Sequence, residues 1–413
     1  MTISRPALVL ATGACAAVAA VALAGPRPPG VTGENWQFGP HNRWAYAHLR
    51  ELLPTKDIPN DYALVRPLPG VESAAGDLQI VIDASAERLA AAMERLYVDG
   101  VIVIQDGRVV VERYADTLAP EQPHLLWSVS KTVTGLVAAT VADDGLIDLG
   151  RSVGDYVPEL ADSGWGRDTL RDVLDMKDSS DWTEDYAAPD STVRRQDCAD
   201  GLLTGPDCAG IPATGNYEFL PRVGHDPERR GRFVYKSGST DVIAWVLEAA
   251  TGERFADLVS ERLWKPIGAE RSAYITVDTG GFTLASGGMA ATLRDIARVG
   301  LLILNRGRAG DIQVVPAAWI DDIFQQPGDP DWPRAHAEGL APYYRSFVWG
   351  RGDGKGTVTA QGVHGQYIYV SPSTATVIAM LSSWPDADGG AAGVGPDGAM
   401  ALLDGIRDAV AKR

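Results

Sequence analysis

The chain has 413 residues, of which 45% are hydrophobic and 22% are charged, a balance typical of globular proteins. This length is sufficient for two lobes around a large core. The formal net charge of −17 argues against nucleic acid and anionic membrane surfaces as partners, because both are themselves negatively charged.

The N-terminus has the pattern of a secretory signal peptide. Arg5 gives a positive start, residues 7–22 are apolar, and Ala22-Leu23-Ala24 offers the small residues of a cleavage site. We therefore expect the protein to be exported to the periplasm or the extracellular space. The alternative is an uncleaved membrane anchor formed by residues 7–24, because this segment is just long enough to span a bilayer.

A hairpin is the clearest element of the first third of the chain. The β-branched runs 101–105 and 108–114 flank Asp106-Gly107, a two-residue turn signal. Before the hairpin we expect a short helix over 42–53. An amphipathic helix over 85–97, capped by Ser85, should follow it.

The middle of the chain is expected to be mainly helical, with long loops rich in Asp, Gly and Pro. The best helices there are 169–176, 240–251 and 255–263. Cys198 and Cys208 form an even pair in a chain expected to be exported, so we predict a disulfide that closes a surface loop. Two free thiols are the alternative. A metal pair is disfavoured, because His225 is the only histidine nearby.

Strand character returns towards the C-terminus. A helix over 286–305 precedes it, and a closing helix is expected over 399–412. The expected strands are 345–349, 357–360, 366–370 and 376–381. The order of sheet, helical middle, sheet and helix predicts one sheet built from both ends of the chain, with a helical insertion between them.

This order also predicts how the chain divides into domains. The expected parts are a signal peptide at 1–24, an N-terminal linker and extension at 25–80, an α/β lobe formed by 81–150 and 286–413, and a mainly helical lobe at 151–285.

Ser128 and Lys131 form the only Ser-x-x-Lys motif in the chain. A helix with one apolar, buried face is expected over 132–143, directly after the motif. Residues three apart on a helix share a face, so the Ser128 and Lys131 side chains should lie one turn apart. A neutral amine beside a hydroxyl can take its proton, and burial favours the neutral amine by lowering the pKa of a lysine. The motif therefore indicates an activated serine nucleophile. The alternative is a solvated pair on a helix surface.

Two distant segments offer partners for this pair. Tyr235 lies in a short β-like run just before the expected helix at 240–251. The glycine-rich segment 360–366 begins a strand, and the backbone there can approach a ligand closely because glycine has no side chain. By contrast, Gly150-x-Ser152-x-Gly154 lacks the strand and helix that a nucleophile elbow requires, so we expect a loop there.

Together, Ser128-x-x-Lys131, Tyr235-x-Ser237 and the strand near Gly362 resemble the three boxes of the serine β-lactamase-related family. The resemblance is to its class C-type, penicillin-binding-protein-like branch, and most closely to the 6-aminohexanoate-dimer (nylon-oligomer) hydrolases. Further segments that match are 42–46, 182–186, 258–268 and 362–366, within a stretch of about 36–410. The resemblance implies an α+β, transpeptidase-like fold, with an antiparallel sheet flanked by helices and a mainly helical second lobe.

The resemblance also implies catalytic roles. Ser128 is the nucleophile, Lys131 is the general base, alone or with Tyr235, and Tyr235 passes a proton to the leaving group. The backbone N–H groups of Ser128 and Val363 form the oxyanion hole. The choice between Lys131 and Tyr235 as the base stays open.

Two positions depart from the lactamase pattern. Ser237 replaces the usual Asn of the second box, and Ala360 replaces the lysine that begins the third box. Loss of that lysine, which helps bind the carboxylate of β-lactams, argues for amide or ester substrates. We expect substrate contacts from Tyr186, Ser237, Gly362 and His364. The alternatives are that Tyr186 packs a loop and that His364 is a packed or surface histidine.

The predicted function is therefore that of an exported serine hydrolase, which cleaves small amide or ester substrates through an acyl-enzyme. The alternatives are a D-alanyl-D-alanine carboxypeptidase, a β-lactamase, and a non-catalytic penicillin-binding-like sensor. No cofactor or metal is expected, because the sequence contains no H-E-x-x-H motif and no Walker-type loop.

Overall fold

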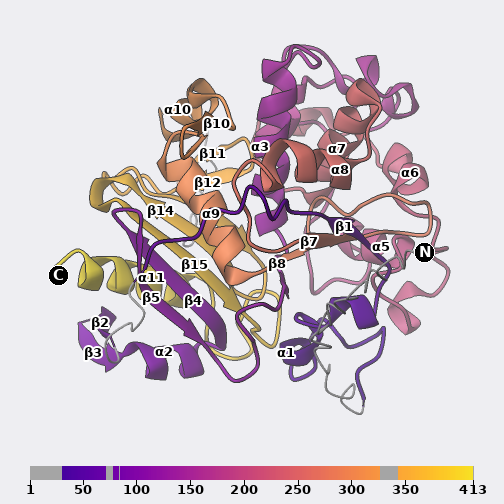
Figure 1. Ribbon diagram of the computed structural model, residues 1–413. Helices are drawn as coiled ribbons and strands as arrows, with labels where there is room; N and C mark the ends of the chain where they lie inside the picture. Colours follow the sequence, from indigo (N-terminus) through magenta and orange to yellow (C-terminus); the bar gives the residue numbers. More distant parts are fainter. Residues whose placement is uncertain (1–29, 71–77, 83, 326–342, 413) are drawn as a thin grey trace, which may run out of the picture.

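The computed structural model describes residues 30–70, 78–82, 84–325 and 343–412, and Figure 1 shows how their elements are arranged. The expected signal peptide at 1–24 lies outside these ranges. Within the described ranges, no helix has both the length and the apolar composition that a membrane span requires.

A seven-stranded antiparallel sheet is the centre of one lobe. Its strand order is β11-β12-β13-β14-β15-β4-β5. The strands are β4 (Val98–Gln105), β5 (Arg108–Tyr114), β11 (Tyr343–Arg345), β12 (Val348–Gly350), β13 (Val358–Gly362), β14 (Gln366–Ser371) and β15 (Thr376–Ser382). The hairpin β4–β5 joins the C-terminal strands through β15, so both ends of the chain build one sheet, as the sequence predicts.

Alternate residues of β4 face two different cores. Ile102 and Ile104 belong to the core shared with the helical lobe, whereas Val101 and Val103 belong to the core beneath the terminal helices. This two-residue period is the pattern expected of a strand covered on both faces. Helix α9 (Leu293–Leu304) covers the first face. Helices α2 (Leu89–Arg95) and α11 (Pro396–Val410) lie on the other side of the sheet (Figure 1).

The second lobe is mainly helical and packs around α3 (Val129–Asp143), which contacts α7 (Ser237–Thr251) and α8 (Phe255–Val259). The remaining helices are α1 (Asn42–Ala45), α4 (Leu170–Leu174), α5 (Thr192–Ala199), α6 (Asn216–Phe219) and α10 (Ala317–Gln325). Nearly every residue of α3 is buried, because the helix lies between the large sheet and the helical lobe. The sequence predicted only one buried face for this helix.

A second sheet, which the sequence analysis missed, leads the chain to the start of α3. Its order is β1-β7-β8-β6, with β1 at Thr55–Ile58, β7 at Ala273–Thr276, β8 at Met289–Ala291 and β6 at His124–Leu125. Just after β6, the Leu126 N–H donates to the carbonyl of Met289 over 2.8 Å. This sheet therefore fixes the backbone immediately ahead of Ser128.

The bounds predicted for two helices near the N-terminus are wrong. The segment 42–53 forms α1 and a separate 3-10 turn at Leu49–Glu51. The segment 85–97 begins as strand β3 (Ser85–Arg88), paired with β2 (Gln79–Ile82), and becomes helical only at α2. Pairing with β2, which lies against α11, overrides the local helix signal.

Two further expectations near the C-terminal half need correction. The helix expected over 286–305 starts only at α9, because the preceding residues pair as β8 in the small sheet. The strand expected at 345–349 is two strands, β11 and β12, joined by Ser346 and Phe347, which both have positive φ. Such a turn normally carries Gly or Asn, so the sequence gave no turn signal there.

Candidate active site

Ser128 lies at the N-cap position of α3, immediately before Val129 and directly after a strained residue. Trp127 has a φ of 46°, in the left-handed region that bulky side chains rarely adopt and that occurs at functional sites. The Ser128 hydroxyl does not cap the helix. Instead, Lys131 Nζ lies 2.7 Å from Ser128 Oγ, from the next turn of the same helix. The Ser-x-x-Lys pair is therefore in contact.

The Lys131 side chain is only 1% exposed, and no carboxylate of the described residues lies within hydrogen-bonding distance of its amine. Its second contact is the carbonyl of Ser286, to which Nζ donates over 2.7 Å. Burial lowers the pKa of Lys131 from 10.5 to about 8, although the charges of Glu184 and Asp241 act in the opposite direction. A substantial fraction of the amine is thus neutral at a mildly alkaline pH.

Tyr235 comes from the loop ahead of α7 and completes a three-residue cluster. Its ring centroid lies 5.2 Å from Lys131 Nζ, and its ring stacks on Trp349 of β12 at 5.5 Å. Burial raises the pKa of Tyr235 above its usual value, followed by the charge of Glu184, while a hydrogen bond with Ser128 lowers it. The phenol therefore keeps its proton near neutral pH.

The backbone of β13 approaches the nucleophile closely at its last residue. A Cβ on Gly362 would lie 2.7 Å from the carbonyl oxygen of Leu126 and 3.1 Å from Ser128 N. A side chain there would crowd the backbone, so the close approach requires glycine. Val363 follows directly and lines the same space as Ser128. The two N–H groups expected to form an oxyanion hole thus belong to adjacent segments of backbone.

Two pockets meet at Ser128. Residues that line both are Ser128, Tyr186, Val363 and Ala387. The first pocket extends towards the polar side chains of Gln37, Arg194, Gln196, Asp197, Ser237 and His364 and is called the polar pocket, although apolar atoms form most of its exposed lining. The second is mainly aromatic and extends towards Tyr235, Trp349, Gly362, Tyr367, Trp384 and Asp388. A substrate whose scissile bond lies at Ser128 could therefore place one half in each pocket.

Glu184 links several parts of the site, and the sequence analysis did not single it out. Its carboxylate accepts hydrogen bonds from Trp182 Nε1 (2.5 Å) and the Tyr186 hydroxyl (2.6 Å). It also accepts from the backbone N–H of Ser237 (2.8 Å) and from its hydroxyl (2.5 Å). The segment 182–186 was recognised only as a whole, because the importance of Glu184 comes from contacts with a residue 53 positions away.

Ser237 and Tyr186 both reach the site, but each is already hydrogen-bonded to Glu184. Ser237 lines the polar pocket from the first turn of α7, and its hydroxyl points to the carboxylate. Tyr186 lines both pockets. Burial and the Glu184 charge raise the pKa of Tyr186 well above its usual value, so its hydroxyl stays protonated. One carboxylate therefore holds the hydroxyls of two residues that line the pockets, one on a loop and one on α7.

His364 lies in the polar pocket and is buried, with an exposed fraction of 2%. Its Nδ1 lies 2.7 Å from the carbonyl of Trp384, and its ring stacks at 5.6 Å on that of Trp127. Burial lowers the pKa of His364 to about 4. The imidazole is therefore neutral at physiological pH, with Nδ1 as the donor to the carbonyl. The structure thus combines the two alternatives: His364 is a packed histidine that also lines the pocket.

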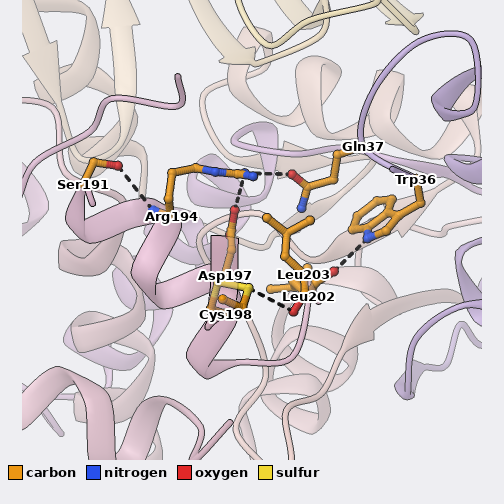
Figure 2. The surroundings of a disulfide bond; sticks show 9 residues. Trp36, Gln37, Ser191, Arg194, Asp197, Cys198, Leu202 and Leu203 are labelled. Carbon is orange, nitrogen blue, oxygen red and sulfur yellow. Dashed lines mark hydrogen bonds and ion pairs between the residues drawn. A yellow bond between two sulfur atoms is a disulfide. The ribbon is translucent and has the colours of Figure 1, made fainter. Parts of the chain in front are cut away.

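Cys198 and Cys208 are joined, with a sulfur–sulfur distance of 1.99 Å, and the loop between them follows α5 (Figure 2). Within this loop, the Leu202 carbonyl accepts a hydrogen bond from Trp36 Nε1 over 2.7 Å. The Trp36 ring in turn stacks on Trp127 at 5.7 Å, nearly parallel to it. The loop is thus connected through two aromatic rings to the residue before Ser128.

Helix α5 supplies a charge pair to the polar pocket. Arg194 Nη1 lies 2.7 Å from the Asp197 carboxylate and 3.0 Å from Gln37 Oε1 (Figure 2). Burial raises the pKa of Asp197 to about 6, and Arg194 opposes this effect. Across the parts of the chain that the structure describes, no group of three His, Cys, Asp or Glu residues could hold a metal ion.

A hydroxyl, a lysine with a lowered pKa, a protonated phenol and adjacent backbone amides define the site of an acyl-transferring serine enzyme. Comparison with known proteins agrees. The β-lactamase family model matches residues 83–395. A 6-aminohexanoate-dimer hydrolase from Paenarthrobacter ureafaciens is 39% identical over 363 residues, which cover 86% of this chain and 88% of the relative.

Solved structures show the same fold. A Bacillus anthracis protein, provisionally described as a 6-aminohexanoate-dimer hydrolase, has a TM-score of 0.82 at 27% identity. The superposition covers 94% of this chain and 98% of that protein. A D-stereospecific amidohydrolase from Streptomyces has a TM-score of 0.52 at 18% identity, with 73% and 96% covered. The chain belongs to the β-lactamase family and is a serine hydrolase. The predicted family and the α+β, transpeptidase-like fold are both confirmed.

Proposed function

We propose that the protein hydrolyses amide bonds of small molecules through an acyl-enzyme on Ser128. The observation that carries this proposal is the 2.7 Å contact between Ser128 Oγ and the amine of Lys131, a buried lysine whose pKa is lowered to about 8. The 39% identity to a protein named as a 6-aminohexanoate-dimer hydrolase supports an amide as the substrate, and an ester as a simpler acyl donor.

Acylation begins with attack on the substrate carbonyl. The neutral amine of Lys131 takes the proton of Ser128 as Oγ bonds to the carbonyl carbon, and the N–H groups of Ser128 and Val363 stabilise the resulting oxyanion. Donors of this kind each lower the barrier by roughly 3 kcal/mol. The opposite pKa directions of Lys131 and Tyr235 favour the lysine as the base, because the phenol keeps its proton.

Collapse of the tetrahedral intermediate breaks the carbon–nitrogen bond. Tyr235 gives its proton to the departing amine, and the ammonium of Lys131 restores that proton. The aromatic pocket beside Tyr235 would then hold the leaving group, and the polar pocket would hold the acyl group. Water then attacks the acyl-enzyme by the same proton route, which releases the acid and regenerates Ser128.

The third box favours amides and esters over β-lactams. Ala360 lies within β13, where it pairs with Ile368, and its side chain is buried. This position therefore offers no cation to the carboxylate of a β-lactam. We expect turnover of a 6-aminohexanoate dimer or of p-nitrophenyl acetate to exceed turnover of nitrocefin. A D-amino-acid peptide in the same panel tests for carboxypeptidase activity.

The experiment that tests the nucleophile is labelling with a fluorophosphonate probe. Wild-type protein should label with one equivalent, and the Ser128→Ala variant should not label. A wild type that fails to label, or a variant that labels equally, would contradict the assignment. A protein that labels but turns over none of the four substrates would be an acyl-binding sensor.

We also propose that the protein is exported, on the basis of the signal-peptide pattern at 1–24. Expression of the full chain with N-terminal sequencing of the recovered protein tests this. Cleavage after Ala24 is expected. Retention of residues 7–24 in a membrane fraction would favour the anchor instead.

A further inference from the structure

The amine of Lys131 has a second hydrogen-bond partner besides Ser128. The carbonyl of Ser286 accepts a hydrogen bond from Nζ, and the N–H of the same residue donates to Asp241 Oδ1 over 2.9 Å. Asp241 lies on α7, one helical turn after Ser237, and is fully buried. One carboxylate therefore fixes the residue whose carbonyl holds the lysine.

The second oxygen of Asp241 is fixed just as firmly. Oδ2 accepts a hydrogen bond from Gln196 Nε2 over 2.8 Å, and the same Nε2 donates to Asn216 Oδ1 over 2.9 Å. Within the described residues, Asp241 forms no ion pair with an arginine or lysine. Burial raises the pKa of Asp241 to about 6, and the hydrogen bonds with Gln196 and Ser286, followed by the charge of Lys131, oppose this effect.

We propose that Asp241 is a positioning residue for the Lys131 base, acting through the backbone of Ser286. This inference rests on the proposed function, because it concerns the same acyl transfer. Asp241 touches neither Ser128 nor either pocket, and its effect passes through one backbone residue to Nζ. A displacement of about 1 Å at a reacting group can reduce a rate roughly 100-fold, so this support is expected to matter.

Asp241 also has an electrostatic effect that can be separated from its geometric one. Its negative charge stabilises the ammonium form of Lys131, and Glu184 acts in the same direction. Tyr235 also faces the amine, and it is protonated. Asp200 faces Asp241 from beyond α5, where burial and neighbouring carboxylates raise its pKa well above the usual value. Removal of the Asp241 charge should therefore make Lys131 neutral at a lower pH.

The test measures the second-order rate of fluorophosphonate labelling against pH. The labelling rate should fall on the acid side of this profile, which we call the acid limb, and reach a plateau at higher pH. In Asp241→Asn the acid limb should move to lower pH. The plateau rate should fall about 10-fold, because the Ser286 peptide is held less well. In Asp241→Glu the charge remains but the carboxylate is displaced. The plateau should then fall while the acid limb stays in place, and this variant also serves if the asparagine variant does not fold.

Asp295→Asn is the matched control. Asp295 is also buried and accepts hydrogen bonds from two backbone N–H groups, those of Glu270 and Arg271, but it pairs with Arg298 at 3.1 Å and does not act on the residue that holds Lys131. Its variant should lose thermal stability with no change in the acid limb. If Asp241→Asn behaves in the same way, with a lower Tm and an unmoved limb, Asp241 is structural and the inference is wrong. If the wild type does not label at all, the proposed function fails first.

Discussion

Two lysines are fully buried in the part of the chain that the structure describes, and their surroundings differ in one respect. Lys236 lies in the helical lobe, where Nζ contacts Asp178 Oδ1 at 2.7 Å and its carbonyl at 2.5 Å. Lys131, at the start of α3, contacts a hydroxyl and a carbonyl, and none of the carboxylates in the described ranges contacts it. A buried carboxylate stabilises a buried ammonium, whereas burial alone favours the neutral amine. The partner therefore decides which lysine is structural and which can act as a base.

The strongest test of this difference between the two lysines is removal of the proposed base, Lys131. Lys131→Met should lower kcat/KM about 10²- to 10⁴-fold, the usual contribution of a general base. Its thermal stability at pH 7 should not fall below that of the wild type. Keeping Lys131 protonated and buried below pH 8 costs roughly 3 kcal/mol, given the pKa shift from 10.5 to about 8.

The sign of this cost gives an independent check. Between pH 8 and pH 10.5 the unfolded chain binds a proton at Lys131 that the native protein does not bind, so wild-type stability should gain from this group as pH rises through that window. Urea unfolding at several pH values measures the gain, which Lys131→Met should lack. A large loss of stability in Lys131→Met at pH 7 would instead identify Lys131 as a structural lysine.

The opposite result is expected for the other lysine. Lys236→Met leaves the carboxylate of Asp178 buried without its cation, so the free energy of unfolding should fall by about 3–5 kcal/mol. Activity per correctly folded site should change far less than in Lys131→Met. Lys265→Met is the control, because Lys265 pairs with Glu261 on the surface, where such a pair contributes about 0–1 kcal/mol. Equal losses in the two variants would contradict the comparison.

The disulfide tests whether the difference between the lysines is local. The double variant Cys198→Ser, Cys208→Ser removes the bond between two residues that are ten positions apart in the sequence. The free energy of unfolding should fall by about 2–4 kcal/mol. The acid limb of labelling should stay where it is, because neither sulfur lies next to Lys131. A shift of the limb would mean that the loop acts on the base through Trp36 and Trp127.

The sequence predicted the parts of the site whose chemistry fixes residue type and spacing. Ser128 and Lys131 are one turn apart on a single helix, so their contact follows from the helix repeat. The β-branched run of β4, next to the Asp106-Gly107 turn, likewise predicted a strand, and this strand belongs to the large sheet. The small sheet could not be predicted, because β6 and β8 have only two and three residues and gain their order from pairing.

The sequence also did not predict the buried carboxylates that hold the residues of the site in place. Asp241 and Glu184 owe their positions to partners 45 and 53 residues away in the chain, Ser286 and Ser237 respectively. A lone carboxylate in a sequence gives no sign of such contacts, because most Asp and Glu residues are solvated. The predicted division of the chain at 150 and 285 stays a prediction.

Glu184 offers the finest test, because it is a carboxylate close enough to affect Lys131 without contacting it. In Glu184→Gln the charge is lost, so the pKa of Lys131 should fall further and the acid limb of labelling should move to lower pH. The amide can accept through one oxygen only, so the bonds that Trp182 and the Ser237 N–H donate to Oε2 cannot persist together with those that Tyr186 and the Ser237 hydroxyl donate to Oε1. We therefore expect KM for the amide substrate to rise about 10-fold, in line with the 1–3 kcal/mol cost of an unsatisfied buried group. Glu184→Asp keeps the charge, so it should raise KM without moving the limb, and a limb that moves equally in both variants would show that loop position rather than charge controls the base.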